Sequence, residues 1–116
     1  VIDDVREQRL IASSMLDKLN YSVTTVESGE KAIEYLKNNS SDLILLDMIM
    51  DPGIDGLETY KNILHYHPKQ KAIIASGFSE TVRVKEALNL GAGLYIKKPY
   101  RLEDLGLAVK TELQRT

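Results

Sequence analysis

A continuous apolar run, Leu-Ile-Leu-Leu at residues 43–46, is followed directly by Asp47. Four consecutive apolar residues are typical of a strand that is covered on both faces, as the strands of parallel sheets are. Residues 72–75 form a second run of this kind, and segments with helical spacing separate the runs along the chain. This alternation predicts an α/β domain in which helices cover both faces of a parallel sheet.

Five strand-like segments alternate with five helical patterns. The central strands of such a sheet are its most apolar, so the third and fourth segments are expected at its centre. Right-handed crossovers then favour a doubly wound five-stranded parallel sheet with strand order 2-1-3-4-5. The strands are expected at residues 1–3, 22–26, 43–46, 72–75 and 94–96. The helices are expected at residues 6–19, 29–37, 80–90 and 102–113, with a further one from Asp55 or Gly56 to about residue 65. Ser28 and Ser79 are the expected N-caps of the helices at 29–37 and 80–90.

Composition excludes several classes of protein. The chain has 116 residues, the usual size of one domain, and no cysteine, so it has neither a disulfide framework nor a thiolate zinc site. A net charge of -2 argues against direct nucleic-acid binding. No apolar run approaches the roughly 20 residues that span a bilayer, and we expect a cytoplasmic protein without a membrane segment.

The first expected strand is only three residues long, and no methionine precedes it. Strands usually have about five or six residues. We therefore expect residues 1–116 to be a single domain excised from a longer protein.

Three aspartates are expected to meet at one edge of the sheet. Asp3 and Asp4 end the first strand and Asp47 ends the third, and in order 2-1-3-4-5 these strands are neighbours at the switch point where ligands bind. Two carboxylates about 4 Å apart repel by roughly 4 kcal/mol at an effective dielectric of 20. Either one aspartate holds a proton or a cation neutralises the pocket, and oxygen ligands alone favour Mg²⁺ before Mn²⁺ or Ca²⁺.

The ends of the last two strands add polar groups to the same edge. Ser76 and Gly77 follow the fourth strand, and Lys97, Lys98 and Pro99 follow the fifth. A carboxylate, a divalent cation, a hydroxyl and an ammonium group together suit phosphoryl transfer, with the carboxylate as the nucleophile.

In their order and spacing these residues resemble the receiver domain of two-component response regulators over nearly the whole chain. Such domains have a flavodoxin-like (βα)5 fold. The resemblance implies that Asp47 accepts a phosphoryl group and that Asp3 and Asp4 hold Mg²⁺. The matching features are Asp3-Asp4, Asp47, Met50, Asp55-Gly56, Ser76-Gly77, Gly91-Ala92-Gly93-Leu94-Tyr95 and Lys98-Pro99.

The resemblance also assigns roles to the residues around the acidic cluster. It implies that the backbone carbonyl of Ile49 is a further metal ligand and that Ser76 is a switch hydroxyl. Tyr95 matches the switch aromatic, and Lys98 matches the phosphate-binding lysine. The peptide bond between Lys98 and Pro99 is expected to be cis.

The loop after Asp47 departs from the family pattern. One additional residue lies between Met50 and Asp55, in the segment Asp51-Pro52-Gly53-Ile54. Ile49 precedes this insertion, so the metal ligands are expected to be unchanged. A loop of this length is similar to that of receivers attached to hybrid sensor histidine kinases.

These features together predict a phosphorylation-driven switch that serves two-component signalling or a phosphorelay and catalyses its own phosphorylation and dephosphorylation. The expected partner is a histidine kinase or a histidine phosphotransfer domain. Leu107 falls off the apolar stripe of the last helix and lies near Tyr95 and Tyr100 in the expected fold. The resemblance to receivers implies that the last helix and strand form a partner surface, for a homodimer or for an effector.

Three other functions compete with this one. An unphosphorylated interaction scaffold of the same fold would usually lack one of the acidic residues or the lysine. A flavin-binding electron carrier needs a phosphate loop rich in Gly, Ser or Thr after the first strand, where Val5-Arg6-Glu7 stands. A phosphohydrolase with an aspartate nucleophile would have a second acid two residues after Asp47, where Ile49 stands.

Overall fold

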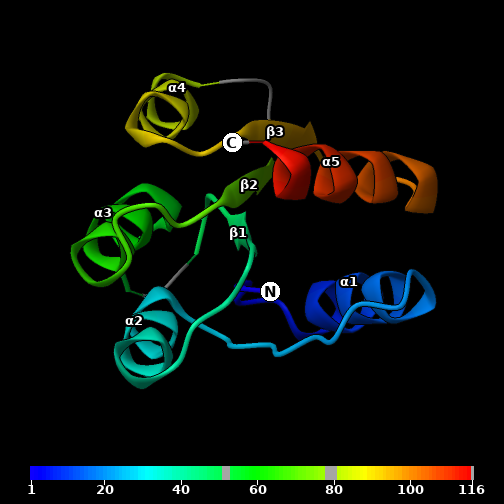
Figure 1. The fold of residues 1–116 in the computed structure, drawn as a ribbon, viewed down its shortest axis with the longest axis horizontal. Coiled ribbons are helices and arrows are strands. Elements are labelled where there is room, and N and C mark those ends of the chain that lie inside the picture. The colour runs from blue at the N-terminus through cyan, green and yellow to red at the C-terminus, as the bar shows by residue number, and fades with distance from the viewer. Residues whose placement is uncertain (51–52, 78–80, 116) are drawn as a thin grey trace.

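The computed structural model describes residues 1–50, 53–77 and 81–115. Within them, three parallel strands form one sheet in the order β1-β2-β3 (Figure 1). The register places Asp47 beside Ala75 and Ser76 beside Lys97, so the carboxyl ends of the three strands share one edge. The strands are β1 (Ile44–Asp47), β2 (Ala72–Ser76) and β3 (Leu94–Lys97).

Five helices cover the two faces of this sheet among the described residues. In Figure 1, α1 and α5 lie on one side, and α2, α3 and α4 lie on the other. None of these helices has the length and apolarity needed to cross a lipid bilayer. Their bounds are α1 (Arg6–Lys18), α2 (Gly29–Asn38), α3 (Gly56–Tyr66), α4 (Val82–Leu90) and α5 (Leu102–Gln114).

Alternate residues of each central strand enter different cores. In β1, Leu46 packs with α2, α3 and α4, whereas Leu45 packs with α1 and α5. In β2, Ile74 and Ile73 divide in the same way, and all four side chains are buried. Because both faces are covered, the strands carry continuous apolar runs, and the predicted parallel α/β architecture is confirmed.

The first two expected strands are present only as isolated bridges. Ile2 pairs in parallel with Val26 on one side and with Leu46 on the other. Its amide donates to the carbonyl of Leu45 at 2.8 Å, and its own carbonyl accepts from the amide of Asp47 at 2.9 Å. The structure therefore does not confirm a five-stranded sheet, although the bridges place residue 2 between Val26 and β1.

Two details of the helices differ from expectation. The N-cap of α4 is Thr81, whose hydroxyl accepts from the amide of Val84 at 3.2 Å, so the prediction of Ser79 is wrong; Ser79 itself lies outside the described residues. The apolar residues of α1 fall at helical spacing, which predicts one inward face for Leu10, Ile11, Met15, Leu16 and Leu19. Leu10 and Ile11 are, however, 57% and 48% exposed. The helix instead buries Ala12, a small residue that the apolar pattern undervalued.

Candidate functional site

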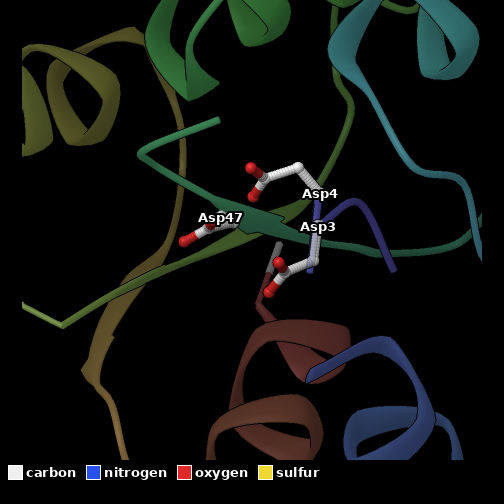
Figure 2. Close-up of side chains that lie close together, drawn as sticks. All are labelled: Asp3, Asp4 and Asp47. Carbon is white, nitrogen blue, oxygen red and sulfur yellow. The ribbon is translucent and has the colours of Figure 1, made fainter. Parts of the chain in front are cut away.

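The three predicted aspartates lie together at the carboxyl edge of the sheet. Asp3 and Asp4 follow the bridged residue Ile2, and Asp47 ends the neighbouring strand β1. One carboxylate oxygen from each lies within 4.8 Å of the others, and Figure 2 shows the side chains converging from these two segments. Asp3 and Asp47 are buried, and Asp4 is partly exposed. The edge therefore concentrates negative charge where little water reaches it.

One ammonium group bridges two of these carboxylates. Lys98 Nζ donates to Asp3 Oδ2 at 2.7 Å and to Asp47 Oδ1 at 3.1 Å. The amide of Lys98 donates to the carbonyl of Ser76 at 2.7 Å, which fixes the lysine backbone beside the end of β2. The Lys98–Pro99 peptide bond is cis. Lys97, the alternative lysine of the sequence, is exposed.

The surroundings of Asp47 make its carboxyl group an unusually weak acid. Burial raises the pKa of Asp47 to about 6, the nearby Lys98 opposes this rise, and Asp3 and Asp4 add to it. Burial also acts to lower the pKa of Lys98, but its bonds and charge interactions with Asp3 and Asp47 outweigh this and leave that pKa raised. The cluster thus combines a cationic lysine with a carboxylate that is basic for an aspartate.

The comparison with known protein families agrees with this geometry. The family model described as "Response regulator receiver domain" matches residues 1–110. The chain belongs to this family. Members of the family are receiver domains of two-component systems, and the acidic edge formed by Asp3, Asp4 and Asp47 is therefore an edge of a receiver domain.

Individual relatives and solved structures support the assignment. The receiver is 28% identical over 113 residues to "Sporulation initiation phosphotransferase F" of Bacillus subtilis, with 97% of this chain and 90% of that protein covered. It is 32% identical over 116 residues to "Transcriptional regulatory protein CpxR" of Klebsiella pneumoniae; the whole chain matches 49% of that relative and so spans about half of its length. The solved receiver domain of NtrX from Brucella abortus has a TM-score of 0.92 at 22% identity, covering 99% of this chain and 97% of that one, which shows a shared fold.

The loop that leaves β1 carries the predicted carbonyl ligand. Ile49 lies between Met48 and Met50, which are both buried, while its own side chain is 53% exposed. The amide of Gly56 donates to the carbonyl of Met48 at 2.8 Å and closes the base of the loop. A Cβ at Gly56 would lie 2.5 Å from the carbonyl oxygen of Asp47, so only glycine lets α3 start this close to the acidic cluster.

The two predicted switch residues lie on the neighbouring strands. Ser76 is the last residue of β2 and is buried, at the same edge as Asp47. Tyr95 lies on β3 beside Ile74, half-buried against the core that α2, α3 and α4 share. The receiver therefore has a hydroxyl at the reactive edge and an aromatic side chain between β3 and the α4 side of the sheet.

Two contributors to the site were not identified from the sequence. Arg9, which we would assign to the solvent face of α1, is half-buried, and its Nη1 donates to the backbone carbonyl of Asp3 at 2.8 Å. Tyr100 lies near Lys98, Asp3 and Asp47, and burial is the main cause of its raised pKa. The sequence pattern did not predict either contact, because Arg9 reaches from α1 to the segment before it, and Tyr100 reaches from the segment after β3 to Asp3 and Asp47.

The pKa of Asp47 gives a prediction for the metal-free protein. Its pKa in the folded protein, about 6, lies above the ordinary value of 3.8. The free energy of unfolding therefore falls as the pH rises from about 4 to about 6, because the folded protein holds the proton more tightly than the unfolded chain does. Below about pH 4 the carboxyl group is protonated in both the folded and the unfolded protein. Asp47→Asn should therefore raise the free energy of unfolding in EDTA at pH 7 by about 1–2 kcal/mol, a figure discounted for solvent screening. Urea unfolding of the wild type and Asp47→Asn at pH 4 and pH 7 checks this prediction. An equal gain in the free energy of unfolding at the two pH values would contradict it.

Proposed function

We propose that this receiver domain accepts a phosphoryl group on Asp47 from a histidine kinase or a histidine phosphotransfer domain, in a reaction that depends on Mg²⁺. The observation that carries the proposal is the convergence of Asp3, Asp4 and Asp47 within 4.8 Å, with Lys98 bridging two of them. The same residues would serve a phosphorylation-driven switch.

The donor set suits a hard divalent cation. Three carboxylates without histidine or cysteine offer only oxygen, the ligand type that Mg²⁺ prefers and Mn²⁺ accepts. The side chains of Asp3, Asp4 and Asp47 and the backbone carbonyl of Ile49 would hold the ion. When bound, it would neutralise negative charge on the carboxylates and on the phosphoryl oxygens.

The chain's own groups account for the transfer step. An oxygen of the ionised Asp47 carboxylate attacks phosphorus, the P–N bond of the phosphohistidine breaks, and its electron pair stays on the imidazole nitrogen. A pKa near 6 leaves Asp47 largely ionised at pH 7, yet more basic than an ordinary aspartate. Lys98 Nζ, which already donates to Asp47, would donate to a phosphoryl oxygen, and the hydroxyl of Ser76 would bind another.

Phosphorylation would be read out at the switch residues. A phosphoryl oxygen on Asp47 would attract the hydroxyl of Ser76 and with it the chain that follows β2. Tyr95, half-buried on the adjacent strand, would turn inward as that segment moves. The presence of all three acidic residues, with Lys98 bonded to Asp3 and Asp47, supports a signalling role over an unphosphorylated scaffold.

The surroundings of the site suit a protein phosphodonor. Four apolar residues on α1 or beside the acidic cluster are exposed, and a partner carrying phosphohistidine would dock there: Val5, Leu10, Ile11 and Ile49.

On the last helix, Leu107 is 69% exposed, as expected, and would contribute to a homodimer. For this role we also propose a cytoplasmic location and a parent protein that is a hybrid histidine kinase. For the sheet we propose strand order 2-1-3-4-5, because Ile2 bridges Val26 on one side and Leu46 on the other.

Intact-mass measurement tests the proposed function. The protein is incubated with acetyl phosphate in Mg²⁺ or in EDTA. We expect the mass to rise by one phosphoryl group with Mg²⁺ and to stay unchanged in EDTA. An unchanged mass under both conditions would contradict phosphoryl acceptance, and equal labelling in EDTA would contradict the metal requirement.

A further inference from the structure

A side chain of α2 holds the segment through which the β1–α3 loop returns to α3. The amide of Ile54 donates to Glu30 Oε2 at 3.1 Å. The preceding residue, Gly53, has φ +107°, and a Cβ there would lie 2.8 Å from the same oxygen. A side chain at position 53 would therefore both strain the backbone and displace the carboxylate. Glu30 lies in the first turn of α2, where the positive end of the helix dipole favours a carboxylate.

The start of α2 packs closely against this loop and against α3. A Cβ at Gly29 would lie 1.9 Å from Thr59 Oγ1 on α3 and 2.9 Å from Ile54 Cγ1. The helix backbone therefore lies directly against both elements, and α2 and α3 run side by side in Figure 1. Glu30 projects from a base that is fixed by close packing on α3.

The other end of the same loop carries Ile49. The amide of Met48 donates to the carbonyl of Ala75 at 3.0 Å, and its carbonyl accepts from the amide of Gly56 at 2.8 Å. These bonds fix the first residue of the loop and close its base. The loop contains one residue more than the family pattern, and each added residue increases the conformational freedom that must be lost when a loop is ordered. The bond from Ile54 to Glu30 limits that freedom on the returning side.

We propose that Glu30 is a positioning residue, which holds the returning end of the lengthened loop at Ile54 and thereby limits the positions that the Ile49 carbonyl can take up relative to the carboxylate cluster. The inference rests on the proposed function, because the carbonyl is useful only if this edge binds a divalent ion. Glu30 acts through the loop backbone and takes no part in the phosphoryl transfer. Without it, ordering the loop would be an added cost of metal binding.

The test compares three variants of the whole chain by two measurements. Glu30→Ala removes the acceptor, Glu30→Gln keeps an acceptor oxygen without the charge, and Glu34→Ala removes a charge from the same helix, where it pairs with Lys37 at 3.3 Å. The first measurement is hydrogen exchange at the Ile54 amide in EDTA. The second is Mg²⁺ affinity by calorimetric titration.

In Glu30→Ala we expect faster exchange at Ile54 and Mg²⁺ affinity weaker by about three- to tenfold, the ratio that corresponds to a typical net hydrogen bond. Glu30→Gln should recover most of both, and Glu34→Ala should match the wild type. Equal Mg²⁺ affinity in Glu30→Ala and the wild type would overturn the inference while leaving the proposed function intact. So would Glu30→Gln and Glu34→Ala binding as weakly as Glu30→Ala, because charge alone would then explain the loss. A wild type that binds no Mg²⁺ would overturn both proposals.

Discussion

Asp47→Asn should take up no phosphoryl group from acetyl phosphate under conditions in which the wild type is labelled to completion. The asparagine side chain keeps the shape of aspartate, and its amide oxygen can still accept from Lys98 Nζ, which lies 3.1 Å from Asp47 Oδ1 in the wild type. Asparagine, however, lacks the ionised oxygen that attacks phosphorus. Loss of labelling with retention of the fold would separate a chemical role of Asp47 from a structural one.

The matched control for this variant is Asp42→Asn. Asp42 precedes β1 at the opposite end from Asp47 and is exposed, so its carboxylate is remote from the cluster. Intact-mass measurement at several times should show wild-type labelling for Asp42→Asn and none for Asp47→Asn. Full-rate labelling of Asp47→Asn would exclude Asp47 as the acceptor. The same samples, unfolded in urea, verify that both variants are folded.

The sequence predicted those parts of the fold and site that depend on local pattern. The apolar run before Asp47 and the run at 72–75 are continuous because helices cover both faces of the sheet, and the structure has strands there. The capping oxygen of Ser28 lies at the start of α2, as its position predicted, and α3 begins at Gly56, one of the two starts expected for it. Parallel strands bring their carboxyl ends to one edge, and this rule, together with an order that places the first and third segments side by side, predicts that Asp3 and Asp47 meet.

The remaining features depend on contacts between different elements, which local pattern does not encode. Arg9 binds the carbonyl of Asp3 from α1, and Glu30 binds the amide of Ile54 across two elements. Hydrophobicity gives only part of the inward face of α1, since the helix buries Ala12 as well as Leu16 while Leu10 is exposed. A hydrophobicity pattern gives a small buried residue such as Ala12 little weight.

Lys98→Met is expected to slow labelling by acetyl phosphate by about 100-fold, the usual effect of losing one preorganised donor at a developing negative charge. Lys98 Nζ donates to both Asp3 and Asp47, so it lies where a phosphoryl group on Asp47 would need a cation. Methionine fills a similar volume without the charge. Because the ammonium group competes with a divalent ion for the same carboxylates, Mg²⁺ affinity should stay the same or increase.

Lys97→Met provides the matched control, since Lys97 is the adjacent residue on β3 and is exposed. Its labelling rate should stay close to that of the wild type, and its Mg²⁺ affinity should change little. Initial rates from intact mass, together with calorimetric Mg²⁺ titration, distinguish the two lysines. If Lys98→Met labelled as fast as Lys97→Met, the lysine would be a structural counter-ion for Asp3 and Asp47 and not a phosphate ligand. If instead Lys98→Met lost both labelling and Mg²⁺ binding, its role would be to hold the carboxylates in the geometry that binds the ion.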